Sequence, residues 1–358
     1  MVDNLKFYKQ KKIDRVRISA PVEDGLVEMH RNISPGFISE SAFHDFLSIL
    51  KKTDLDKYPE IDPLIDKIAK YHQLKKDNIM VTSGIDGGLK AVFEMCTTQG
   101  DQIATYYPSY AMYSVYSEIF NLTILPIVID VKTLSVTIED VYRVLERNIS
   151  VLFLANPNMP IETSFSFTDI ENIVNRAKKY ETLVVIDEAY ALFGCDSSIS
   201  LITKFDNILI ARTFSKALGM PGIRLGYMLG NGKLVSYLQS RRFAHESNAL
   251  TVAAGIWALD HIDKTTIIKD NVIKIREWFK SQLQNIGVNC YGSLSNTVIL
   301  KLESKEEVDS LSLALKQDGY LIKNNYPEGY ENFASITIGD KKIMKNVLSS
   351  IKNHLIKE

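Results

Sequence analysis

The chain has 358 residues, of which 46% are hydrophobic and 24% are charged, which is enough for a sizeable core in more than one domain. A formal net charge of −1 excludes a general electrostatic attraction to nucleic acid or acidic membranes, and the three widely spaced cysteines predict neither a metal site nor a disulfide framework. Without a signal peptide or an apolar run of membrane-spanning length, the sequence predicts a cytoplasmic protein.

Short apolar runs alternate with amphipathic helical patterns from about residue 60 onward. Leu64 and Ile68 mark the stripe of one helix, and Thr137 and Thr168, each followed three residues later by a carboxylate, are expected to cap two others. Apolar runs that alternate with helices are typical of a mostly parallel sheet with a helical layer on each face. The strands are predicted at residues 79–81, 102–105, 151–155, 183–186 and 208–210.

The pattern changes after about residue 260. Ile268, Val272 and Phe279 share one face of a long predicted helix. Strands and helices then no longer alternate tightly, which favours a smaller α+β domain. Its strands are predicted at 296–302, 320–322 and 334–338, and its terminal helix at 341–352. The predicted fold class is α/β, with an N-terminal arm or small-domain part at 1–45, a large three-layer αβα domain at 46–255 and a small domain at 256–358.

The candidate reactive residues follow two neighbouring strands, where ligands bind in sheets of this kind. Asp187 ends the run LVVID, and Lys216 follows the run ILIAR in a turn rich in hydroxyl groups. A desolvated lysine amine is nucleophilic and condenses with aldehydes. A buried carboxylate would keep a pyridine nitrogen protonated, which makes the ring an electron sink. A phosphate would suit the hydroxyl groups of Thr213 and Ser215 and the guanidinium group of Arg224.

In their order and spacing, these segments resemble the class I and II aminotransferases of pyridoxal-phosphate (PLP) fold type I, most closely the histidinol-phosphate aminotransferase group. The resemblance extends from about Tyr58 to Gly339. It implies PLP as the cofactor, and Lys216 as both the Schiff-base lysine and the base that moves the Cα proton. It also implies that Asp187 binds the pyridinium nitrogen and that Tyr190 hydrogen-bonds the ring O3′. Thr213, Ser215 and Arg224 would bind the cofactor phosphate.

Upstream segments extend the resemblance to both ends of the cofactor. The turn VTSGIDGGL at 81–89 matches a helix N-terminus that binds the phosphate, at Gly84, Ile85 and Asp86. In the segment YYPSYAMY at 106–113, Tyr110 matches the tyrosine that stacks on the cofactor ring, with Tyr113 as a second candidate.

Two further matches concern the neighbouring subunit and the substrate. Tyr58 resembles the tyrosine that reaches the phosphate of the neighbouring subunit's cofactor, which implies a homodimer. Asn32 resembles the asparagine of an N-terminal substrate-binding segment, N-E-x-P, although Ile33 replaces the glutamate.

The first departure from the family pattern is the segment NPNMPIE at 156–162, where NPNNPTG is usual. The second internal asparagine of that motif normally donates a hydrogen bond to the cofactor O3′. Met159 stands in its place and cannot donate such a bond. Asn158 is the expected replacement, in a turn that Ile161 and Glu162 alter further.

The second departure is Ser335, in the segment FASITIG, where the family has an arginine that binds the substrate carboxylate. Losing hydrogen bonds to a charged group costs roughly 1.5–3 kcal/mol for each bond. An ordinary amino-acid transaminase would therefore need a substitute. We expect Asn32, Lys323 and Ser335 to contact the substrate, and the candidates for the missing cation are Lys323, His30, Arg31, Arg241 and Arg242.

These departures leave several functions open. The preferred one is aminotransfer on a small phosphorylated amine, amino acid or ketone, and the alternative is decarboxylation of a phosphorylated amino acid, as in the related threonine-phosphate decarboxylases. Another reaction at Cα, such as oxidation or elimination, is a third. A PLP-binding regulator would carry a DNA-binding module, yet only about 50 residues, without a helix-turn-helix pattern, precede the matching region. A silent relative would be expected to lose Lys216, Asp187 or Arg224, and all three are present.

Overall fold

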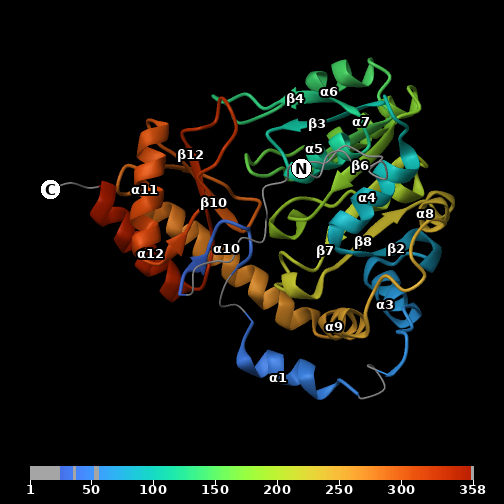
Figure 1. The fold of residues 1–358 in the computed structure, drawn as a ribbon, viewed down its shortest axis with the longest axis horizontal. Coiled ribbons are helices and arrows are strands. Elements are labelled where there is room, and N and C mark those ends of the chain that lie inside the picture. The colour runs from blue at the N-terminus through green and yellow to red at the C-terminus, as the bar shows by residue number, and fades with distance from the viewer. Residues whose placement is uncertain (1–24, 35–37, 52–55, 356–358) are drawn as a thin grey trace, which may run out of the picture.

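The computed structural model describes residues 25–34, 38–51 and 56–355. Its centre is a seven-stranded sheet of order β2-β8-β7-β6-β5-β3-β4, in which β8 alone runs antiparallel to its neighbours (Figure 1). The predicted mostly parallel sheet is therefore confirmed. Its strands are β2 (Ile79–Ser83), β3 (Gln102–Tyr107), β4 (Thr123–Val128), β5 (Val151–Ala155), β6 (Leu183–Asp187), β7 (Ile208–Thr213) and β8 (Leu225–Gly230).

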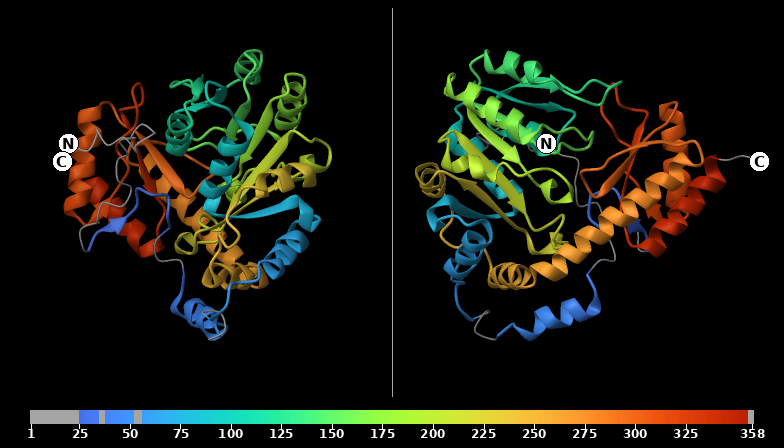
Figure 2. Two further views of the ribbon diagram at one scale, coloured as in Figure 1. Left: turned by 45° about the vertical axis from the view of Figure 1, so that its right-hand side comes forward. Right: turned by 180° about the vertical axis from the view of Figure 1, so that it is seen from behind.

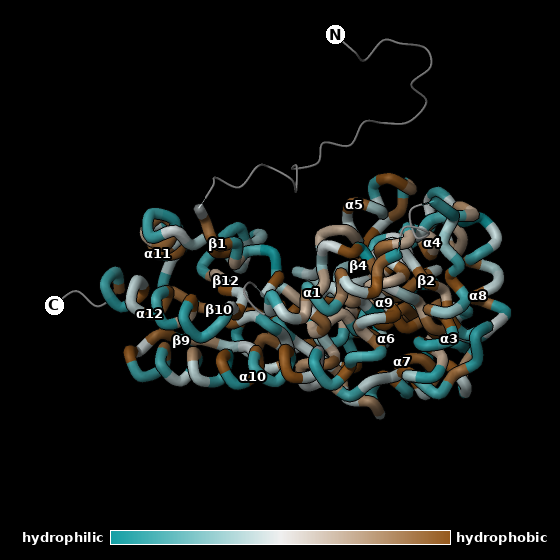
Figure 3. The backbone as a smooth tube through the Cα atoms, turned by 90° about the horizontal axis from the view of Figure 1, so that it is seen from below, coloured by the Kyte–Doolittle hydropathy of each residue, from teal (hydrophilic) through white to brown (hydrophobic). Residues whose placement is uncertain are grey.

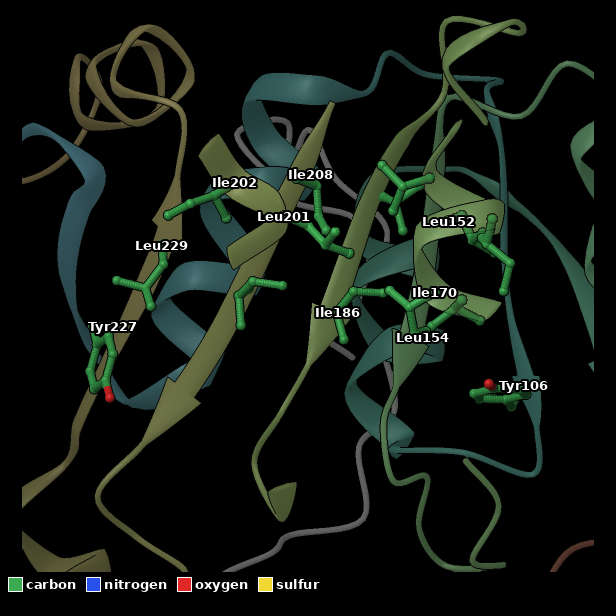
Figure 4. Packing of buried hydrophobic residues seen from close by; sticks show 14 of the residues in the cluster. Tyr106, Leu152, Leu154, Ile170, Ile186, Leu201, Ile202, Ile208, Tyr227 and Leu229 are labelled. Atoms are coloured by element: carbon green, nitrogen blue, oxygen red, sulfur yellow. The ribbon is translucent and has the colours of Figure 1, made fainter. Parts of the chain in front are cut away.

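Helices cover both faces of this sheet. Alternate residues of β5 face opposite ways, so Leu154 joins the core on one face and Phe153 the core on the other. Figure 4 shows the first core, where Ile170 of a covering helix lies close to Leu154. The first face carries α3 (Asp62–His72), α6 (Ile138–Leu145), α7 (Phe167–Lys178) and α9 (Ala249–Asp260), and the second carries α4 (Gly84–Cys96), α5 (Ala111–Ile119) and α8 (Gly232–Gln239).

A second, smaller sheet packs against three helices with a core of its own. The long helix α10 (Ile262–Gln284) leads from α9 into this part of the molecule (Figure 2). Its tube alternates between hydrophobic and hydrophilic residues, as expected of a helix with one buried face (Figure 3). The sheet has the order β12-β10-β9, and the elements are β9 (Asn289–Tyr291), β10 (Thr297–Lys301), β12 (Phe333–Thr337), α11 (Lys305–Gln317) and α12 (Lys341–Leu355).

The segment at 27–29 packs onto this smaller part, whereas Ala42 and Phe46 further along pack against a core of the large sheet. Strand β1 (Val27–Glu28) pairs in parallel with β11 (Tyr320–Leu321), and α1 (Glu40–Ser48), which the sequence did not predict, buries no residue completely. The first 24 residues of the predicted arm lie outside the described residues. The domain limits at 45 and 255 stay predictions.

One of the two helix caps predicted from the sequence, at Thr137 and at Thr168, is confirmed. Thr137 and Asp140 form the predicted capping box at the start of α6. The prediction that Thr168 caps the next helix is wrong, because α7 begins earlier, with Ser166 as its cap and Asp169 as the reciprocal partner. Both sequences fit a capping box, and the earlier start lets the Asp169 carboxylate accept from the Ser166 hydroxyl group. The remaining short elements are 3₁₀ helices: η1 (Lys76–Asn78), η2 (Ala191–Phe193), η3 (Ile199–Thr203) and η4 (Pro221–Ile223).

Candidate active site

The carboxyl ends of the parallel strands bring the predicted residues to one edge of the large sheet. Asp187 is the last residue of β6, Thr213 the last of the adjacent β7, and Gly84 follows β2. Since β8 is antiparallel to both β2 and β7, β2 and β7 point the same way. In the part of the chain that the structure describes, no group of acidic, histidine and cysteine side chains could hold a metal ion.

Asp187 is a buried carboxylate held by two hydrogen bonds. Its Oδ1 accepts from the backbone N–H of Ala189 at 3.0 Å, and its Oδ2 accepts from the hydroxyl group of Tyr113 at 3.0 Å. Burial raises the pKa of Asp187 to about 6, although both hydrogen bonds lower it. The site therefore favours a cation beside this carboxylate. Tyr113, the second stacking candidate of the sequence, instead donates its hydroxyl hydrogen bond to Asp187, a contact that the sequence does not indicate.

Lys216 contacts the backbone of Arg31 and Asn32. Its Nζ donates to the carbonyl oxygen of Asn32 at 3.0 Å and to that of Arg31 at 3.4 Å, and lies 5.4 Å from the centre of the Tyr190 ring. The side-chain amide of Asn32 donates to the Tyr190 hydroxyl at 2.7 Å. Asn32 has a positive φ of 54°, a conformation that asparagine tolerates better than most residues. The structure thus brings together the predicted Lys216, Tyr190 and Asn32.

The start of α4 and Arg224 form a place for an anion. Gly84 has a φ of +65°, which favours glycine, and a Cβ there would lie 2.8 Å from the Arg224 guanidinium and displace it. Ser83 does not cap the helix with its side chain, which leaves the first-turn N–H groups of Ile85 and Asp86 directed at the same space. Arg224 is held 3.5 Å from the Asp86 carboxylate.

Thr213 and Ser215, both predicted to bind the cofactor phosphate, form a hydrogen bond within the turn that follows β7. The hydroxyl group of Thr213 accepts from the backbone N–H of Ser215 at 3.0 Å and thereby shapes the turn that carries Lys216. Tyr110 donates to the Asp86 carboxylate at 2.8 Å, with its ring perpendicular to that of Tyr113. The Tyr110 side chain is partly exposed.

Asn158 does not replace the missing asparagine. Both of its side-chain N–H groups are used, one by the Pro108 carbonyl at 3.0 Å and the other by the Ile161 carbonyl at 2.8 Å. Its oxygen accepts from the Ser109 hydroxyl at 2.6 Å. Asn158 therefore stabilises the turn and has no free donor for a cofactor oxygen, and Met159 beside it is buried. This geometry could not be read from the sequence because Pro108 lies on a different strand end.

Ser335 lies directly opposite Lys323. The two residues exchange backbone hydrogen bonds of 2.8 and 3.0 Å, so their side chains lie on the same face of the strand pair. Burial lowers the pKa of Lys323, whose ammonium lies 5.9 Å from the centre of the Tyr326 ring. Among the described residues no carboxylate forms an ion pair with Lys323, whereas Arg31 pairs with Glu28.

The other candidate cations are less suitable. Arg242 pairs with Glu246 and donates to the Val81 carbonyl, so it is used within the large sheet. Arg241 is exposed. Burial lowers the pKa of His30, which favours its neutral form. Lys323 is therefore the candidate cation that lies opposite Ser335 and forms no ion pair with a carboxylate of the described residues.

Tyr58 lies on the surface of a single chain. Its side chain is 76% exposed and stacks on His245 with ring centres 4.1 Å apart. Its predicted role belongs to a neighbouring subunit and stays a prediction. No helix in the described part of the chain is both long and apolar enough to cross a membrane.

A lysine, a buried carboxylate and a helix N-terminus without a side-chain cap lie at one edge of a three-layer αβα sheet, an arrangement typical of PLP enzymes of fold type I. The family model of aminotransferases class I and II matches residues 25–351. The chain belongs to this family and is a PLP-dependent aminotransferase.

Comparisons with individual proteins agree. The chain is 33% identical over 309 residues to a histidinol-phosphate aminotransferase of Brachyspira hyodysenteriae, covering 84% of each chain. The fold is similar to that of the Sinorhizobium meliloti histidinol-phosphate aminotransferase in complex with pyridoxal-5′-phosphate, with a TM-score of 0.85, 20% identity and coverage of 92% and 90%. It is also similar to L-threonine-O-3-phosphate decarboxylase of Porphyromonas gingivalis, with a TM-score of 0.75, 20% identity and coverage of 93% and 100%.

Proposed function

We propose that this enzyme transfers the amino group of a small phosphorylated amine or amino acid, and that Lys323 binds the substrate phosphate. The observation that carries this proposal is the half-buried Lys323 side chain opposite Ser335, which has no carboxylate partner among the described residues. A buried lysine without a counter-ion is costly, so a bound anion there gains the attraction that the protein itself does not use. The histidinol phosphate of the curated relatives is an anion of this class.

The residues around the cofactor take the following proposed roles. When bound, PLP supplies the aldehyde that takes up the amino group and a ring that accepts the negative charge left at Cα. The amine of Lys216 removes the Cα proton and later returns it. Asp187, held by Tyr113, keeps the ring nitrogen protonated, and Tyr190, oriented by the Asn32 amide, donates to the ring oxygen.

The cofactor phosphate is assigned to the helix N-terminus. The N–H groups of Ile85 and Asp86 and the side chains of Ser215 and Arg224 would hold it, while the Gly84 N–H donates to the Arg224 carbonyl at 2.9 Å and Thr213 supports the turn. Tyr110 would stack on the ring. These residues fit a phosphorylated pyridine because they place an anion site, a buried carboxylate and an amine at one sheet edge.

The first test adds amines singly to the PLP-loaded enzyme: glutamate, alanine, serine phosphate, histidinol phosphate and serinol phosphate. We expect a phosphorylated amine to convert the lysine-bound cofactor to its pyridoxamine form, which absorbance detects. If no amine causes this conversion, the aminotransferase proposal for this substrate class is wrong.

Ser335 favours decarboxylation as a second candidate, because no arginine is present at that position to hold an α-carboxylate in the plane of the cofactor. Consumption of serine phosphate with release of carbon dioxide, while the lysine-bound absorbance persists, would select this reaction.

Replacing Lys323 with methionine is expected to raise the KM for a phosphorylated amine. One hydrogen bond to a charged group contributes roughly 1.5–3 kcal/mol, which corresponds to about 10- to 150-fold in KM. The KM for an unphosphorylated amine should stay nearly constant. Lys301→Met is the matched control, because Lys301 is a half-buried lysine of the same sheet that binds the Val131 carbonyl. Equal effects in both variants would argue against a phosphate site at Lys323.

We also propose a homodimer in which Tyr58 contacts the cofactor phosphate of the neighbouring subunit. Tyr58 is 76% exposed and stacks on His245, and Phe243, two residues before His245 in the sequence, is 83% exposed, so both aromatic rings are available to a partner subunit. Tyr58→Phe should weaken PLP binding several-fold without changing the sedimentation coefficient of the dimer. A monomeric wild-type enzyme, or unchanged PLP affinity in the variant, contradicts this proposal.

A further inference from the structure

Glu162 connects the two parts of the molecule at an unusual position. It stands in the altered NPNMPIE segment, beyond the end of β5 in the large sheet. Its carboxylate accepts from two successive backbone N–H groups beyond β9 of the small sheet, those of Ser293 at 2.6 Å and Leu294 at 3.0 Å. Each carboxylate oxygen takes one N–H group, and hydrogen bonds to an ionised acceptor are stronger than neutral ones.

We call residues 292–296 the small-sheet turn. Gly292 has a φ of +107°, and a Cβ there would lie 2.8 Å from the Thr297 carbonyl oxygen, so the turn depends on glycine. Leu294 also packs near Gly194 of the large part, where an added Cβ would lie 3.3 Å from its side chain. The turn therefore contacts two segments of the large part of the molecule, at Glu162 and at Gly194.

Asn296, the last residue of the small-sheet turn, forms hydrogen bonds with the segment that contacts Lys216. The side-chain amide of Asn296, fully buried, donates to the Asn32 carbonyl at 3.1 Å and to the Ser34 hydroxyl at 3.0 Å. The same Asn32 carbonyl accepts from the Nζ of Lys216 at 3.0 Å. Hydrogen bonds thus lead from the Glu162 carboxylate through one short turn to the segment that touches the catalytic lysine.

We propose that Glu162 is a positioning residue, which holds the small-sheet turn and through it the Asn32 segment over Lys216. The inference rests on the proposed roles of Lys216 and Asn32. Glu162 does not reach the lysine itself, and its effect travels through backbone and Asn296 contacts. Without the Glu162 carboxylate, the small-sheet turn loses its hydrogen bonds to the large part of the molecule. The Asn32 segment is then no longer held in a fixed position relative to Lys216.

The test compares Glu162→Ala and Glu162→Gln in the full-length, PLP-loaded enzyme. Amide hydrogen exchange should become faster at Ser293 and Leu294, and also at Asn32, which Glu162 does not touch. With an amine that the wild-type enzyme accepts, Glu162→Ala should raise KM about tenfold, the loss of roughly one hydrogen bond to a charged group, and change kcat less. The amide oxygen of Glu162→Gln keeps one acceptor, so its shifts should be smaller.

Glu146→Ala is the control, since Glu146 forms an exposed ion pair with Arg176 within the large part. Unchanged exchange at Ser293 and Leu294 overturns the inference, and so does faster exchange there with unchanged exchange at Asn32 or unchanged KM. Exchange needs no substrate, so it decides the positioning role even if every amine fails and the proposed function falls. If Glu162→Ala does not fold, Glu162→Gln supplies the same readouts.

Discussion

Replacing Lys216 with alanine is expected to abolish turnover and to remove the absorbance band of lysine-bound PLP. The lysine amine both forms the covalent link and moves the Cα proton in the proposed reaction. A general base alone contributes about 10²- to 10⁴-fold to a rate, and losing the covalent link adds to this. We therefore expect a loss of at least about 10⁴-fold in kcat, measured with the amine that the wild-type enzyme accepts.

The matched control is Lys90→Ala, because Lys90 lies on α4 beside the site but its side chain is 53% exposed and pairs with Glu94. This variant should keep both the absorbance band and turnover. Substantial turnover in Lys216→Ala, or an intact band, would show that another lysine carries the cofactor.

Replacing Asp187 with alanine is expected to be the second largest loss. The carboxylate is buried and its hydrogen bonds from Tyr113 and Ala189 aim it at a fixed place. Removing one partner of a buried ion pair costs roughly 3–5 kcal/mol, which is about 10²- to 10⁴-fold in rate. We expect kcat to fall by this factor and PLP to bind more weakly, measured by steady-state kinetics and by absorbance titration with PLP.

The same carboxylate should make the stability of the cofactor-free enzyme depend on pH. Burial raises the folded-state pKa of Asp187 from 3.8 to about 6, so the folded state binds a proton more tightly than the unfolded state. This contribution to stability is fully present below the unfolded pKa and is lost as pH rises through the folded pKa. The melting temperature should therefore fall between about pH 4 and pH 6. Asp187→Asn should lack this component, and an identical pH profile in both proteins would contradict the assignment.

Much of the fold was predictable because its signals are local. Five apolar runs, including LVVID and ILIAR, fall within strands of the large sheet. A strand that is buried on both faces must be apolar throughout, so its sequence shows it without knowledge of its neighbours. Strands β4 and β8 were not predicted, because Pro126 interrupts the apolar run of the one and Gly226 that of the other.

The sequence by itself determined the chemistry that sits at strand ends. Asp187, Tyr190 and Lys216 follow apolar runs at short range, and parallel strands bring such residues to one edge whatever the details of packing. The unusual residues Met159, Glu162 and Ser335 were also visible, because a departure from a family pattern is a property of the sequence alone.

Only the tertiary structure decided what those departures do. In the structure, Lys323 lies opposite Ser335, and both amide N–H groups of Asn158 donate to carbonyl groups around its own turn. The Asn32 carbonyl accepts a hydrogen bond from Lys216, which is 184 residues away in the sequence. Such contacts depend on strand register and on the packing of distant segments, and a hydrogen bond between remote residues leaves no periodic pattern in either of them. Hydrophobic periodicity therefore fixes where elements form, while the partners of polar side chains are settled only when those elements pack.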